Sequence, residues 1–272
     1  MHSFLLRPKW ILFHLLAVAG IIGMLSASHW QWTKYNARNA FVEQVGVRQD
    51  TKRTPPVALT TLLDQPVADI EYRIATAVGS YIADGQLTQI LRTQEGVNGV
   101  YVLTPFQIDN GPIVLVNRGF VPDRTEAPPP PDGRLTIGGS IEASQQRRTG
   151  ELTDNAAGES SDVRRIDLPL IETEIGLQLA PVYLDFIASQ PPATQPPAPV
   201  PPPDVSGDTP YLSYTVQWLV FSTAVAVGWV LAVRRSIRTN RKRRADEAAA
   251  TNADLISVDA EAGGEPPSRP SA

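Results

Sequence analysis

The 272-residue chain contains no cysteine, which excludes disulfides, thiolate metal sites and cysteine nucleophiles. It has only three histidines, His2, His14 and His29, and all of them precede residue 33. The central part of the chain therefore cannot hold a serine–histidine–aspartate triad or a histidine metal site. A P-loop and a paired-glycine dinucleotide motif are also missing. With so few catalytic groups, we predict a protein that is not an enzyme.

Charge is scarce in two long parts of the chain. The formal net charge is −4, which is too small to indicate a nucleic-acid-binding protein. Residues 10–32 and residues 211–233 carry no formal charge at all. Each run can cross a hydrocarbon layer of about 30 Å as a helix, and the tryptophans near the run ends match an interfacial aromatic belt. The two runs therefore predict two transmembrane helices.

The distribution of positive charge predicts the orientation. Two cations precede the first run, and seven follow the second within residues 234–244. Because cytoplasmic flanks are rich in lysine and arginine, residues 1–9 and 234–272 should be cytoplasmic and residues 33–190 should lie on the other side. The first run starts too early to leave room for a mitochondrial presequence, so we expect a bacterial plasma membrane.

The first run has a second interpretation as a secretory signal peptide. Ser26-Ala27-Ser28 would be its small-residue cleavage site. The run is long for a signal peptide, which favours an uncleaved helix. Both interpretations leave the central domain outside the cytoplasm.

Short runs rich in β-branched and aromatic residues, separated by turn signals, fill the central domain. The expected strands cover residues 71–82, 86–94, 101–108, 113–121, 134–142 and 182–187. Asp84-Gly85 predicts a hairpin between the first two, and turns are expected at residues 96–99 and 109–111. The pattern predicts an α+β domain with an antiparallel barrel or sandwich, entered by a short helix at residues 33–47.

Two other segments have unusual composition. Residues 191–210 are proline-rich and predict a stiff, polyproline-like or disordered linker to the second membrane helix. A ligand for a proline-binding domain is the alternative. Residues 128–131 predict a surface loop, and the tail after Arg244 has the composition of a disordered segment.

Asn117-Arg118-Gly119 closes an apolar strand with a polar residue, a fixed cation and a glycine. Arg118 could pair with a carboxylate of a ligand or partner. Alternatively, Arg118 satisfies the end of the strand and Gly119 allows a β-bulge. The residues alone favour the second interpretation.

A second group of candidate residues flanks the membrane runs. Its members are His29, Trp30 and Gln31 after the first run, and Tyr211, Tyr214, Gln217 and Trp218 at the start of the second. An antiparallel helix pair would bring the two sets to the same depth. Interfacial anchoring explains the aromatic residues. His29 and Gln217 fit less well, because polar side chains near the apolar core usually have a partner, and His14 is expected to hydrogen-bond within the helix pair.

Four ordered pieces of sequence resemble the Surfeit locus protein 1 family of cytochrome c oxidase assembly factors. They are Trp30-Gln31, Tyr101-Val102-Leu103-Thr104-Pro105, Val114-Leu115-Val116-Asn117-Arg118-Gly119-Phe120-Val121-Pro122 and Leu212-Ser213-Tyr214-Thr215-Val216-Gln217-Trp218. The resemblance spans residues 4–235 and includes the two-helix topology. The start, Phe-Leu-Leu-Arg-Pro-Lys-Trp, looks like the high-GC Gram-positive branch.

This resemblance implies a non-catalytic role in maturing subunit I of the oxidase, with haem a handled transiently and oxidase subunits and the lipid bilayer as partners. Many members have a histidine before the Leu-x-Tyr piece, suspected to be a haem ligand, where this chain has Tyr211. A phenol ligates iron only as phenolate, so His29, at the same membrane level, could substitute. The alternatives are a stoichiometric haem-binding chaperone and a membrane-tethered envelope protein unrelated to the oxidase.

Overall fold

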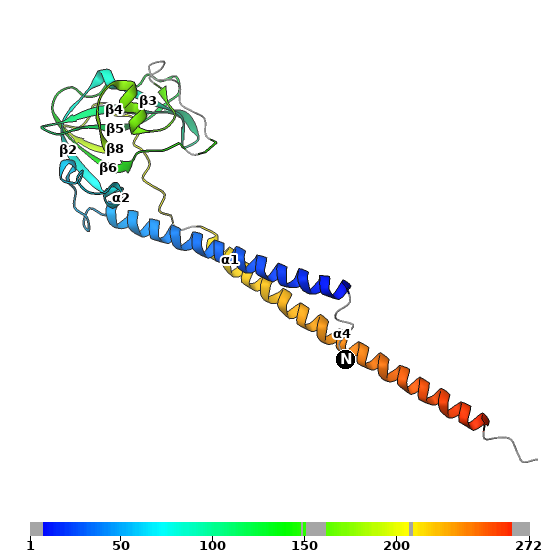
Figure 1. Ribbon diagram of the computed structural model, residues 1–272. Helices are drawn as coiled ribbons and strands as arrows, with labels where there is room; N and C mark the ends of the chain where they lie inside the picture. Colours follow the sequence, from blue (N-terminus) through cyan, green and yellow to red (C-terminus); the bar gives the residue numbers. More distant parts are fainter. Residues whose placement is uncertain (1–7, 148, 151–161, 207–208, 263–272) are drawn as a thin grey trace, which may run out of the picture. The chain divides into compact units, whose positions relative to one another are not determined.

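A computed structural model describes residues 8–147, 149–150, 162–206 and 209–262 of the chain. The chain divides into two compact units (Figure 1). The helix unit comprises residues 1–38 and 208–272, and the barrel unit comprises residues 39–207.

Two long helices, α1 (Pro8–Gln49) and α4 (Tyr211–Ala262), carry the apolar runs. Both are long and apolar enough to cross a membrane. Large apolar side chains are exposed along them, including Leu16 at 63% and Val220 at 58%. Lipid, rather than water, is the solvent that such a surface matches.

Within the helix unit, the less exposed residues repeat at intervals of three or four. On α1 they are Trp10, His14, Ala17, Ile21, Met24, Ser28 and Gln31, and on α4 they are Tyr211, Thr215, Trp218, Ser222, Ala226 and Trp229. This spacing is that of the seam of a coiled-coil helix pair. Small residues such as Ala17 and Ser222 lie at the seam, where they allow the two backbones to approach closely.

Two hydrogen bonds fix the antiparallel register of this pair. Ser28 Oγ donates to the Thr215 carbonyl at 3.1 Å, and Trp229 Nε1 donates to His14 Nδ1 at 2.8 Å. As the residue number rises from His14 to Ser28 on α1, the number of the hydrogen-bonded residue on α4 falls from Trp229 to Thr215. The prediction that His14 hydrogen-bonds within the helix pair is confirmed.

Both helices extend further than the sequence predicts. Residues 33–47 continue α1 without a break instead of forming a separate short helix. The prediction of disorder after Arg244 is wrong up to residue 262, because α4 continues there. Alanine and glutamate are strong helix formers, and Arg243 pairs with Glu247 one turn later at 3.2 Å. The last ten residues of the predicted tail lie outside the described part of the chain.

The described residues of the barrel unit form eight strands and four short helices. The strands are β1 (Val57–Ala58), β2 (Ile74–Tyr81), β3 (Leu87–Gln94), β4 (Val97–Ile108), β5 (Ile113–Pro122), β6 (Leu135–Ala143), β7 (Asp162–Val163) and β8 (Leu179–Gln190). The helices are η2 (Leu59–Thr61), α2 (Val67–Ile70), η3 (Ala83–Gly85) and α3 (Leu168–Ile175).

The strands form one sheet that closes on itself. Its order is β1-β2-β6-β8-β5-β4-β3-β7, and an additional β2–β4 pairing closes β2, β6, β8, β5 and β4 into a barrel. The predicted β-rich α+β domain is therefore confirmed. The sheet is mixed rather than purely antiparallel, because β1–β2, β3–β7 and β5–β8 are parallel pairs.

Two apolar clusters stabilise this unit. The barrel interior is filled by fully buried side chains such as Phe106, Val116 and Leu184. A second cluster, which includes Leu115 and Ile171, packs the outer side of the sheet against α3. Burial alternates along β2, as expected for a strand with one face turned to the core.

The predicted hairpin at Asp84-Gly85 is wrong. Residues 83–85 form the 3₁₀ turn η3, and in the described sheet β2 pairs with β1, β4 and β6 while β3 pairs with β4 and β7. The true hairpin joins β3 to β4 through Glu95 and Gly96, whose φ angles of 51° and 81° suit a type I′ turn. The predicted turn at residues 109–111 is confirmed.

The proline-rich segment that follows β8 is bound to the barrel. Phe120 N donates to the Ala198 carbonyl at 2.7 Å, and Ala198 N donates back to the Phe120 carbonyl at 2.9 Å. Gln94 Nε2 also donates to the Pro199 carbonyl at 3.1 Å. This stretch, predicted to be a stiff or disordered linker, is therefore hydrogen-bonded to the barrel, which its composition does not predict. Residues 191–203 are called the proline strap below.

The packing of α1 on α4 can be tested by cross-linking, because the chain has no native cysteine. We expect Ser28→Cys with Thr215→Cys to form a disulfide under mild oxidation, since these residues touch across the seam. Mass spectrometry of the linked peptides measures the yield. The control is Ile22→Cys with Val220→Cys, which lies at a similar level with both residues 58% exposed. Equal yields for the two pairs would rule out this seam.

Candidate functional site

The Asn117-Arg118-Gly119 motif forms a β-bulge near the end of β5. Leu103 pairs with Asn117 but the preceding Val102 pairs with Gly119, so Arg118 is the extra residue. The interpretation of Gly119 as a bulge residue is confirmed. The bulge directs the side chains of Asn117 and Arg118 into different surroundings.

Arg118 is buried and binds the backbone of a proline loop. Its guanidinium donates to the carbonyls of Pro128 and Pro129 at 2.8 and 2.9 Å and to Gln86 Oε1 at 3.0 Å. It also lies 5.6 Å from the centre of the Tyr81 ring. Burial lowers the pKa of Arg118, and burial raises the pKa of Tyr81 to about 12. Within the described residues Arg118 pairs with no carboxylate, so its pairing with a ligand stays a prediction.

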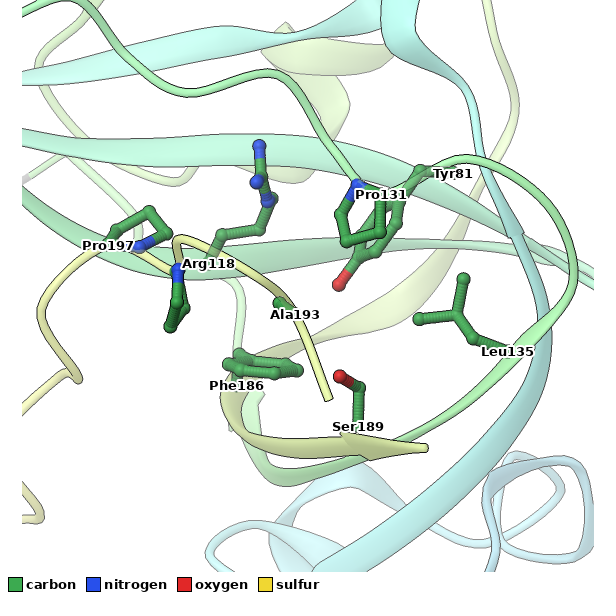
Figure 2. Close-up of a pocket in the computed structure, with 9 residues that line it drawn as sticks. Tyr81, Arg118, Pro131, Leu135, Phe186, Ser189, Ala193 and Pro197 are labelled. Carbon is green, nitrogen blue, oxygen red and sulfur yellow. The ribbon is translucent and has the colours of Figure 1, made fainter. Parts of the chain in front are cut away.

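A small cavity lies beside Arg118, between the barrel and the proline strap (Figure 2). Its volume is about 10 Å³, which is room for a single water molecule. Tyr81, Phe186 and Ser189 line it from the barrel, and Ala193 and Pro197 line it from the strap. With the strap in place, this cavity is too small for an organic ligand.

Asn117 binds a carboxylate instead of the proline loop. Its Nδ2 donates to Asp185 Oδ1 at 2.9 Å, and its own Oδ1 accepts a hydrogen bond from the Gly119 amide at 3.3 Å. The register pairs Asn117 with Asp185 across β5–β8 and Asp185 with Ser140 across β8–β6. A row of polar residues therefore crosses three neighbouring strands.

A second carboxylate, Glu142, extends this row along β6. Ser140 Oγ donates to Glu142 Oε1 at 3.2 Å. Burial, with a further contribution from Asp185, raises the pKa of Glu142 to about 8. Burial also raises the pKa of Asp185 to about 6, against the opposing effect of the Asn117 hydrogen bond. In the described part of the chain, neither carboxylate has a lysine or arginine partner.

The sequence alone does not single out Glu142 and Asp185, because an acidic domain contains many carboxylates. They become a pair only through the β6–β8 register. The one signal available beforehand is a charged residue inside an apolar strand, as in Leu184-Asp185-Phe186.

Gly119 is required where the strap crosses β5. Its φ of 131° is one that side-chain-bearing residues rarely adopt, and an added Cβ would lie 2.3 Å from the Ala198 carbonyl oxygen. The motif thus serves three structural purposes. Asn117 binds Asp185, Arg118 binds the proline loop, and Gly119 admits the strap.

The candidate residues of the helix unit lie at one level but face different ways. The Ser28–Thr215 hydrogen bond brings the two predicted sets together along the pair. Gln31, Tyr211 and Trp218 lie at the seam, whereas His29, Trp30, Tyr214 and Gln217 are exposed. Gln31 Oε1 is buried with no hydrogen-bond partner in the residues that the structure describes. Contact of these residues with a partner or with haem stays a prediction.

The profile of the SURF1 (Surfeit locus protein 1) family matches residues 18–223, which include the barrel unit and part of each apolar helix. The chain belongs to the SURF1 family. The resemblance carried by Trp30-Gln31, Asn117-Arg118-Gly119 and the start of α4 is confirmed.

Similar SURF1 proteins occur in mycobacteria. Uncharacterized SURF1-like proteins of Mycobacterium tuberculosis and Mycobacterium bovis are each 33% identical to this chain over 254 residues, covering 89% of it and 90% of their own length. A SURF1-like protein of Monosiga brevicollis is 28% identical over 197 residues, covering 66% of this chain and 73% of its own. The SURF1 family generally comprises cytochrome oxidase assembly factors, and together with the two apolar helices it indicates a membrane protein.

The two raised pKa values predict that the barrel unit loses stability as pH rises. The folded state keeps the Glu142 proton up to a pKa of about 8, whereas the unfolded chain releases it near the ordinary glutamate pKa of 4.5. Stability should therefore fall between about pH 4 and pH 8, with Asp185 contributing up to its pKa of about 6. We expect Glu142→Gln to flatten this decline and to raise the unfolding temperature at pH 8 by several degrees.

Thermal unfolding of the full chain in detergent, followed by circular dichroism, measures this effect. Glu126→Gln is the matched control, because Glu126 is exposed in a loop and should leave the slope unchanged. A wild-type slope in the Glu142→Gln variant would show that this carboxyl is not the group responsible.

Proposed function

We propose that this SURF1-family chain is a non-catalytic membrane assembly factor for a haem-copper (cytochrome c) oxidase, which assists the maturation of subunit I and the insertion of haem a. The observation that carries the proposal is the surface of the helix unit. His29 and Gln217 are exposed there, among apolar side chains that suit lipid. Neither side chain has a hydrogen-bond partner within the described residues.

The exposed position of Gln217 supports a partner inside the membrane. A carboxamide in hydrocarbon costs free energy unless it is hydrogen-bonded, so polar side chains in membranes generally face protein or water. Trp30 and Tyr214 are also exposed, at 57% and 45%. A helix of a nascent oxidase subunit that packs here would satisfy Gln217 and cover the two aromatic rings.

The charge distribution supports an orientation for this assembly. The seven cations of residues 234–244 would keep the end of α4 cytoplasmic, with both termini on that side and the barrel unit outside. In that arrangement the barrel unit would meet the extracytoplasmic parts of the oxidase. The same cations would face anionic lipid on the cytoplasmic leaflet.

A stoichiometric haem-binding chaperone is the second candidate function, and His29 is the observation that favours it. A neutral imidazole is a good iron ligand, and that of His29 is exposed without a hydrogen-bond partner among the described residues. Tyr211 fits less well, because it lies at the seam and would have to ionise. When bound, haem a would supply an iron centre, and His29 would hold it at the outer surface of α1.

Deleting the gene and restoring it with variants tests the assembly function. We expect the deletion to remove most of the haem a absorbance from membrane difference spectra, and wild-type protein to restore it. Gln217→Leu should accumulate normally but restore little, because the helix loses its polar contact. Val220→Leu, at an apolar position that is also exposed, is the control. A deletion strain with normal oxidase spectra would exclude the assembly role and leave an envelope protein.

Purification in mild detergent tests haem binding separately. We expect His29→Ala to abolish the haem spectrum of the purified protein. His14→Ala should retain it, because His14 is bonded to Trp229 within the pair. An unchanged spectrum in His29→Ala would remove His29 as the ligand without bearing on the deletion result.

A further inference from the structure

A second, larger cavity of the barrel unit lies between the proline strap and strands β6 and β8. Its volume is about 420 Å³, which is within the range of small-molecule sites. It is lined by Gln49, Thr51, Ile74, Ser140, Glu142, Asp185, Phe186, Ile187 and residues 199–203. The cavity is separate from the small one beside Arg118, although the strap and Phe186 contribute to both.

Most of the cavity wall is apolar and cannot donate hydrogen bonds. Ile74, Phe186 and Ile187 contribute hydrocarbon, and four of the five strap residues that line it are prolines without an N–H group. The strap is held in place just before this stretch by the Ala198–Phe120 pair and by Gln94. The wall is therefore a preformed surface for an apolar group.

The polar part of the cavity is acidic. Glu142 and Asp185 are the two carboxylates in its lining. Among the described residues, each receives a side-chain hydrogen bond only from a neutral group, Ser140 Oγ or Asn117 Nδ2. Two neighbouring, half-buried carboxylates repel each other when ionised, so the site has a preference for a positive group. The two carboxylates and the apolar wall together favour a ligand with a cationic end and an apolar body.

We propose that this cavity binds an organic cation, whose ammonium or guanidinium group is held by Glu142 and Asp185 and whose apolar part lies against the proline strap. A metal ion fits less well, because the described residues contain no cluster of three or more histidine, cysteine, aspartate or glutamate side chains. Ser140 and Asn117 orient the carboxylates. This site is independent of the oxidase assembly role and goes beyond it.

The cationic group has two possible sources, a free small molecule or a lysine or arginine side chain of a polypeptide. Both present the same chemistry to the two carboxylates. Binding should release protons near neutral pH, because a cation stabilises the ionised form of Glu142, whose pKa is raised to about 8 in the empty cavity.

Calorimetric titration of the full-length protein in detergent at pH 7.5 tests the site with two probes. Benzamidine represents a small cation with an apolar body, and an acetylated, amidated Gly-Arg-Gly peptide represents a basic side chain. Benzamide and the corresponding citrulline peptide are neutral isosteres of the two probes. Repeating the titration in buffers of different ionisation enthalpy measures proton release.

We expect at least one cation to bind about tenfold or more tightly than its neutral isostere, with proton release. The better-binding probe identifies the source. Glu142→Gln and Asp185→Asn should each weaken binding by about tenfold, whereas Glu126→Gln should not. If neither cation binds more tightly than its isostere, or if folded Glu142→Gln protein binds like wild type, the proposal is wrong. The isostere comparison on wild-type protein decides the matter even if a variant fails to fold.

Discussion

The proline strap is fixed to the barrel by two backbone hydrogen bonds between Phe120 of β5 and Ala198. The described pairing of β5 with β8 ends at Asn117 and Asp185. Further along β5, Phe120 pairs with the strap instead. Gly119 makes the approach possible. Once bound, the strap covers the small cavity beside Arg118 and supplies the proline wall of the acidic cavity.

The same bulge directs the side chains of Asn117 and Arg118 to different partners. Arg118 directs its donors to proline carbonyls, while Asn117 directs its amide to Asp185. Glu142 and Asp185 therefore remain without a cation in the described residues, and burial raises both of their pKa values. In the helix unit, the polar residues likewise divide between a seam and an exposed surface. Both units thus contain polar groups that the described residues leave without a full set of partners.

Local sequence patterns predicted the elements that depend on local physics. Uncharged runs longer than twenty residues identified the membrane-capable helices, and the β-branched run at residues 113–121 identified β5. The turn at Asp84-Gly85 was mistaken for a hairpin because the partners of β2 are set by barrel closure, which is non-local. The docked strap and the carboxylate pair also depend on non-local pairing. The strap docks where Phe120 pairs with Ala198, and the two carboxylates come together because Ser140 lies opposite Asp185.

Amide hydrogen exchange at Phe120 and Ala198 in the full-length protein tests the docked strap most directly. Both amides should exchange as slowly as that of Val116 in the middle of β5, because all three are hydrogen-bonded in the sheet. Gly119→Ala should release both amides, whereas Gly96→Ala, at a positive-φ glycine with open space around it, should leave them protected. Fast exchange at Ala198 in the wild-type protein, or unchanged protection in Gly119→Ala, would contradict a strap fixed on β5.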